Sequence, residues 1–85
     1  MGKIDLGLLA RLRDHPDAAV RLIIRVRGDL PKAAAQLSAR GLTVSRTLQL
    51  INAVAISGHA RDAVALASLS WVQKVEEDRP VSIQR

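Results

Sequence analysis

The groups in this sequence that could do chemistry are two histidines and one run of three acids. His15 and His59 each lack a nucleophile or an acid at a spacing typical of catalytic sites. Glu76, Glu77 and Asp78 form the acid run, but adjacent residues of a strand point to opposite faces, which is poor geometry for a cation cage. The sequence also lacks a glycine-rich phosphate loop. We therefore expect no enzymatic activity, no metal and no other cofactor.

Composition predicts one small folded domain. The chain has 85 residues, which is near the lower limit for a single core without disulfides or metals. Hydrophobic residues make up 48% and charged residues 25%, proportions that favour a globular chain over disorder. Cysteine is absent, so disulfides and cysteine-ligated metals are excluded. The net charge of +5 favours acidic partners weakly, and a solvated basic surface is the preferred explanation.

The hydrophobic runs predict no membrane segment. None approaches the length that spans a bilayer, so we expect no membrane contact. Charged residues such as Asp5 and Arg11 interrupt the region where a signal peptide would be apolar. The sequence as given therefore predicts a cytoplasmic protein.

Hydrophobic periodicity predicts seven elements. Residues 4–14 carry a helical apolar stripe, with Asp5 as the N-cap and Pro16 as the stop. The later elements are a strand at 19–27, a helix at 30–40 begun by Asp29 and closed by Gly41, strands at 42–50 and 51–57 with a turn at Asn52, a helix at 60–69, and a strand from Trp71.

The stretch 19–27 is the clearest strand because its residues alternate in type. One face is aliphatic and predicts a covered side, comprising Val20, Leu22, Ile24 and Val26. The other face is solvated or forms a contact surface, and it carries Arg21, Ile23, Arg25 and Arg27. In the stretch 42–50, Leu42, Val44, Arg46 and Leu48 are expected to share a face in the same way.

The order strand, helix, strand, strand, helix, strand predicts an α+β, ferredoxin-like βαββαβ fold. Right-handed crossovers place both helices on one face of a four-stranded antiparallel sheet and leave the other face open. We divide the chain into a helical preface at 1–18, the main domain at 19–79 and an extended tail at 80–85. Pro80 disfavours helix in that tail.

Three stretches carry a family resemblance by their order and spacing: residues 22–26, residues 50–56 and the C-terminal stretch from Leu66 to Val81. The last contains Val-x-x-Val-Glu-x-Asp, running from Val72 to Asp78, which is the most specific piece. Across residues 20–83 the sequence resembles the propeptide and propeptide-like inhibitor family of subtilisin-type serine proteases.

The resemblance implies a free-standing inhibitor or folding chaperone of a subtilisin-like serine protease. In the family the open sheet face, here Arg21, Ile23 and Arg25, packs on two surface helices of the protease. The positions of Glu76 and Asp78 meet the N-termini of those helices, where carboxylates are stabilised. The tail would lie in the substrate cleft as an added strand, with Gln84 or Arg85 at the primary subsite; it comprises Val81, Ser82, Ile83, Gln84 and Arg85.

Two departures from the family keep alternatives open. No catalytic domain follows Arg85, which suggests a free-standing member or an excised piece. The arginine-rich open face suggests a repurposed protein-interaction module of the same fold, or a small-molecule-binding or oligomerising regulatory module. Nonspecific nucleic-acid binding is a further alternative, disfavoured because the predicted first and third strands offer no aromatic side chain for stacking. The oligomeric state and the choice between inhibition and chaperoning stay open.

Overall fold

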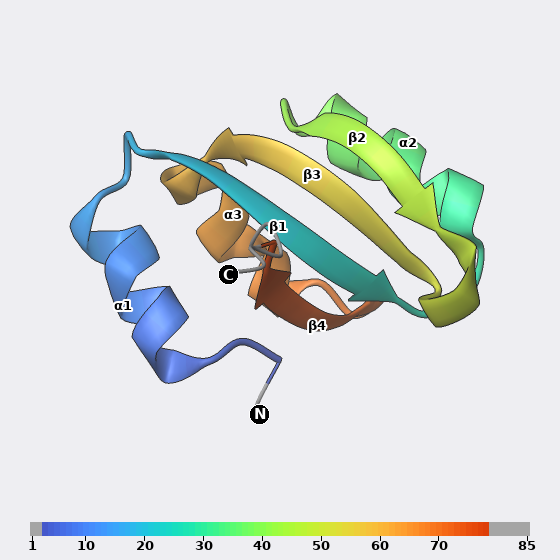
Figure 1. Cartoon of the computed structure of the whole chain (residues 1–85), viewed down its shortest axis with the longest axis horizontal. Coiled ribbons are helices and arrows are strands. Elements are labelled where there is room, and N and C mark those ends of the chain that lie inside the picture. Colours follow the sequence, from blue (N-terminus) through green and yellow to red (C-terminus); the bar gives the residue numbers. More distant parts are fainter. Residues whose placement is uncertain (1–2, 79–85) are drawn as a thin grey trace, which may run out of the picture.

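The computed structural model describes residues 3–78. They form one sheet packed against helices (Figure 1). The order of its elements is α1 (Leu6–Asp14), β1 (Ala19–Val26), α2 (Leu30–Ala39), β2 (Thr43–Leu48), the 3-10 helix η1 (Gln49–Ile51), β3 (Ala53–His59), α3 (Ala60–Val64), the 3-10 helix η2 (Ala65–Ser68) and β4 (Val72–Glu77).

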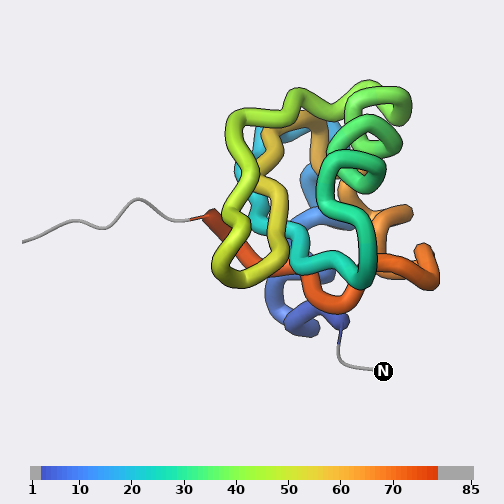
Figure 2. Tube along the Cα trace, turned by 90° about the vertical axis from the view of Figure 1, so that its right-hand side faces the viewer, coloured from blue at the N-terminus to red at the C-terminus, as the bar shows by residue number. Residues whose placement is uncertain are grey.

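The four strands pair in the order β2-β3-β1-β4, and every pairing is antiparallel. This is the strand order of the ferredoxin-like arrangement, so the predicted α+β fold is confirmed. In Figure 2, α2 lies to one side of β2 and β3. The strand β1 is central, because β3 and β4 pair with its two edges. The opposite face of the sheet carries no helix.

The core lies between the sheet and the helices. The inward residues of β1 alternate as the sequence predicts, and Leu22 and Ile24 are completely buried. Their register partners on β3, Ile56 and Val54, point to the same side. The other large enclosed core side chains come from α1, α2, η2 and β4, and are Leu12, Leu37, Leu66, Val72 and Val75. This packing decides which face of each strand is left outside.

The N-terminal segment joins the same core. The predicted N-cap of α1 is confirmed, because the Asp5 carboxylate accepts a hydrogen bond from the Leu8 backbone N–H at 3.1 Å. Leu8 and Leu12 are buried against the main cluster. Before α1, the Val75 backbone N–H donates to the Lys3 carbonyl at 2.6 Å, so residues 3–4 run along the outer edge of β4.

The predicted alternation in residues 42–50 is wrong, because β2 contains a bulge. Its register with β3 shifts between Val44 and Arg46. Val44 pairs with Ile56 on the helix side, whereas Arg46 pairs with Ala55 on the opposite side. An extra residue in one strand reverses the facing of everything that follows it, and this moves Arg46 to the open side.

Several other predicted boundaries differ from the observed ones: the strand expected over residues 51–57 is β3 at Ala53–His59, and two differences involve 3-10 helices. The strand expected over residues 42–50 ends at Leu48, and η1 takes up Gln49–Ile51. The helix expected over residues 60–69 is divided: Ala60–Val64 form the α-helix α3, and Ala65–Ser68 form the 3-10 helix η2. Both changes tighten the chain at the end of an element, where 3-10 geometry is common.

Asn52 fixes the connection between β2 and β3, as its turn chemistry predicts. It adopts the left-handed conformation with φ 51°, which asparagine tolerates better than most residues. Its Nδ2 donates to the Val26 carbonyl at 2.8 Å and to the Gly28 carbonyl at 3.2 Å. The Val26 backbone N–H in turn donates to the Asn52 carbonyl at 3.0 Å. One residue therefore ties this connection to the end of β1.

We predict that Asn52→Ala lowers the free energy of unfolding by about 2 kcal/mol, from the lost side-chain hydrogen bonds and the left-handed strain. Asn52→Gly loses the same hydrogen bonds but not the steric penalty, so it should cost about 1 kcal/mol less than the alanine. Urea unfolding of both variants measures the difference. Equal stability of the two variants would contradict the role of the left-handed conformation.

Candidate functional site

The face of the sheet that carries no helices is the candidate site, and we call it the open face. Its members follow from the strand register, because paired residues of neighbouring strands point to the same side. Within residues 3–78 they are Thr43, Arg46 and Leu48 of β2, Ala53, Ala55 and Ser57 of β3, Arg21, Ile23 and Arg25 of β1, and Lys74 and Glu76 of β4, with Asp78 next in the alternation. The predicted contact residues Arg21, Ile23 and Arg25 lie here together.

The middle of the open face is built from small side chains. Ala53 and Ala55 are 0% and 1% exposed, although they point away from the helices and lie outside the main core cluster. Their register partners on β1 are Arg25 and Ile23, which are longer. The centre of the open face is therefore low and apolar, with longer side chains on either side.

Glu76 lies on the open face and is held loosely between two cations. Its Oε1 is 3.4 Å from Nε of Arg25, and its Oε2 is 3.4 Å from Nζ of Lys74. These distances are longer than ordinary charge-assisted hydrogen bonds, and Arg25 Nε has no hydrogen-bond partner among the described residues. The Glu76 side chain is 33% exposed, so its ion pairs are weak and its carboxylate can still accept hydrogen bonds from a partner.

Asp78 continues the edge beyond β4. Its backbone N–H donates to the Arg21 carbonyl at 3.0 Å, which extends the pairing with β1 by one step. Its side chain makes no ion pair with any residue between 3 and 78. Glu76 and Asp78 thus occupy alternate positions on the same side of the sheet, as the predicted contact with a partner's helices requires.

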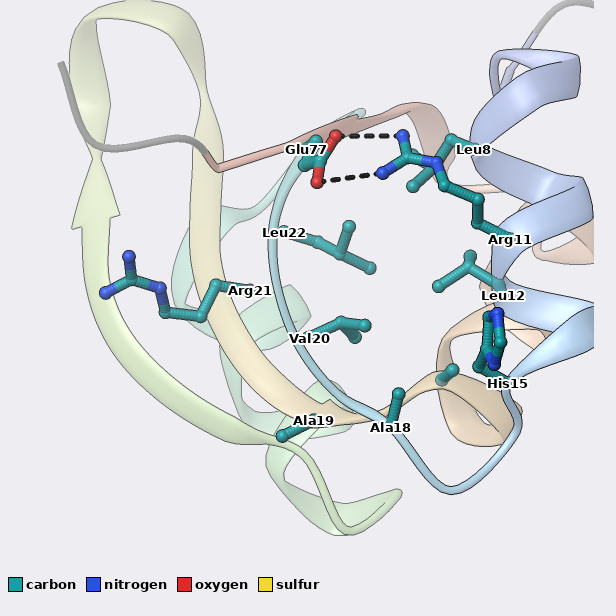
Figure 3. A pocket seen from close by; sticks show the side chains of 11 residues that line it. Leu8, Arg11, Leu12, His15, Ala18, Ala19, Val20, Arg21, Leu22 and Glu77 are labelled. Carbon is teal, nitrogen blue, oxygen red and sulfur yellow. Dashed lines mark hydrogen bonds and ion pairs between the residues drawn. The ribbon is translucent and has the colours of Figure 1, made fainter. Parts of the chain in front are cut away.

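Glu77 points to the other side and has a structural partner there. Its two carboxylate oxygens accept hydrogen bonds from the Arg11 guanidinium at 3.0 and 3.2 Å (Figure 3). The hydrogen bond to Glu77, strengthened by the charge of its carboxylate, raises the pKa of Arg11 above its ordinary value. The acid run is therefore divided: its middle member holds α1, and its outer members face away from the helices.

A cavity of about 230 Å³ lies between α1 and β1, below the pair formed by Arg11 and Glu77 (Figure 3). Its walls are largely aliphatic and include Leu8, Leu12, Val20 and Leu22. His15 stands at its edge without an acid or a nucleophile among the lining residues apart from Glu77, which Arg11 engages. Nothing in this lining resembles a catalytic arrangement.

The described residues contain no group of three or more histidine, aspartate or glutamate side chains placed to hold a metal ion. Between residues 3 and 78 no helix is both long and apolar enough to cross a bilayer.

The tail residues that the sequence analysis predicts to bind a cleft lie outside the described residues; they are Val81, Ser82, Ile83, Gln84 and Arg85.

Sequence reasoning missed two cations of the open face. Arg46 reaches it because of the bulge in β2. Lys74 reaches it because it lies two residues before Glu76 in the regularly paired part of β4, and that two-residue spacing was a usable signal. The β1–β4 register shifts only beyond Lys74, so that Val72 and Val75 both point inward although they are three residues apart. The Arg46 position had no such signal.

Comparison with known proteins adds no assignment. No protein-family model matches this sequence. A search of curated proteins likewise gives no significant match.

We predict that Glu77→Gln speeds hydrogen exchange of the α1 amides several-fold, because the charged pair with Arg11 links α1 to the end of β4. Global stability should change little, since both side chains are partly exposed to water. Glu76→Gln is the matched control and should leave exchange in α1 unchanged. Equal exchange rates in α1 for the two variants would show that the pair does not hold the helix.

Proposed function

We propose that this protein acts as a propeptide-like inhibitor or folding chaperone of a subtilisin-like serine protease, docking by its open face. The observation that carries the proposal is the position of Glu76 and Asp78 on that face, at the end of β4. Had these carboxylates lain beneath the helices, they could not meet another protein. The resemblance in the stretch from Val72 to Asp78 gives the class of partner.

The proposed contact is between these carboxylates and the N-termini of two helices on the protease. Free backbone N–H groups and the helix dipole stabilise a carboxylate there by about 0.3 to 2 kcal/mol. The Asp78 carboxylate makes no ion pair with another described residue, so binding would not have to break one. Glu76 would exchange two loose contacts for short hydrogen bonds, and Arg25 and Lys74 would remain close enough to orient it.

Inhibition in this proposal depends on the residues that follow. Residues 80–85 follow the acid run at the end of β4 after one intervening residue, Arg79. An extended segment anchored at that point can add to the edge of a substrate cleft through main-chain hydrogen bonds. Docking by the open face would raise the effective concentration of this segment at the cleft, so a short tail could block it.

Glu76→Gln and Asp78→Asn should each weaken inhibition of a mature subtilisin-type protease by about 2- to 30-fold, the range that corresponds to the helix-terminus energy. Asp14→Asn, an exposed acid at the end of α1, is the matched control and should leave inhibition unchanged. The inhibition constant is measured against a panel of purified mature subtilisin-type proteases. Failure of the unmodified protein to inhibit or bind any of them rejects the proposed function.

Deletion of residues 80–85 should abolish inhibition and leave the fold intact, since the core cluster of the described residues is drawn from positions 8–75. Circular dichroism checks the fold. Calorimetric binding to a protease whose catalytic serine is replaced by alanine checks docking, which should persist in weakened form. Full inhibition by the truncated protein would reject the role of the tail. The binding measurement tests docking by the open face separately.

A further inference from the structure

We infer that the surface bound by the open face is acidic: a protein surface on which exposed aspartate and glutamate side chains surround a small apolar centre. This inference rests on the proposed function for the identity of the partner, a subtilisin-like protease. It adds a property of the partner that the proposed helix-terminus contacts do not require.

The strand register places four cations on the open face. One row across the sheet runs from Arg46 through Ala55 and Ile23 to Glu76. The row on one side of it contains Arg21, and the row on the other contains Arg25 and Lys74. Cations therefore lie on β2, β1 and β4, around the small residues of β3.

These cations are not neutralised within the described part of the chain. Arg21 and Arg46 are exposed and form no ion pair there. The Arg25 and Lys74 side chains, 43% and 49% exposed, share the single carboxylate of Glu76. By contrast, Arg11 and Arg61 away from this face each have a carboxylate of their own, Glu77 and Asp17. The open face thus keeps an excess of positive charge.

The apolar part of the face favours a protein over a nucleic acid. The partly exposed Ile23 supplies the accessible apolar centre beside the covered Ala53 and Ala55, and the charges form the polar surroundings typical of protein interfaces. Among residues 3–78 the open face has no aromatic side chain on which a base could stack, and Glu76 and Asp78 would repel phosphates. Complementary charge on a protein partner would direct association and exclude wrong partners.

The test uses two blocked helical peptides of equal length, one rich in alanine and glutamate and the other in alanine and lysine. Each is titrated into the isotope-labelled protein and followed by NMR. The glutamate peptide should shift amides of β1 and β3 at low salt, and binding should fall steeply as salt shortens the screening length. Equal or tighter binding of the lysine peptide overturns the inference, as do shifts confined to the helices.

Charge reversal gives the second measurement. The double variant Arg21→Glu, Arg46→Glu should weaken binding of the glutamate peptide by about tenfold or more, because rim charges control steering and specificity. The control, Arg13→Glu with Lys32→Glu, changes net charge equally at exposed positions on α1 and α2, and should change binding by less than about twofold. Circular dichroism checks that both variants fold. Equal losses in the two variants overturn the inference.

Two further results separate this inference from the proposed function. If a subtilisin-type protease binds with an affinity that Arg21→Glu, Arg46→Glu leaves unchanged, the acidic surface is rejected and the protease assignment stands. If the peptide results hold while no such protease is inhibited, the acidic surface stands and belongs to another protein. Tighter binding of single-stranded oligouridylate than of the glutamate peptide at physiological salt overturns the inference in favour of nucleic acid.

Discussion

Burial of one face of the sheet is the constraint on which the rest of this structure depends. Leu22 and Ile24 of the central strand are fully enclosed beneath the helices. Since side chains alternate along a strand, their burial forces Arg21, Ile23 and Arg25 to the opposite side. A slip of one residue would place arginines in the core, so the register of β1 is strongly specified. The position of the open face follows from that register.

The two outer strands then decide what else the open face carries. The bulge in β2 brings Arg46 outward, whereas regular alternation along β4 places Lys74 on the same side as Glu76. The β1–β4 register shifts only beyond Lys74, where it turns Val72 into the core. Bulges at sheet edges commonly redirect side chains, and the bulge in β2 adds positive charge beside the centre formed by β3.

The acid run shows how one short stretch serves two purposes. Its middle member, Glu77, binds Arg11 and ties α1 to the end of β4. Glu76 and Asp78 face the other way, where one is loosely paired and the other makes no ion pair with a described residue. The scaffold therefore presents carboxylates on a rigid edge next to an excess of cations. A partner that offers helix N-termini together with acidic side chains would match both sets of charges.

The sequence alone determined the order of the elements, the ferredoxin-like fold, the inward face of β1 and the turn at Asn52, because each depends on local periodicity or on the conformational preference of one residue. It also predicted that Arg21, Ile23 and Arg25 would share a surface. Only the tertiary structure decided that Arg46 joins them and that Arg11 engages Glu77. Those features depend on register between strands and on contacts across 66 positions of the chain, and pairing energies between distant segments leave no periodic trace in the sequence.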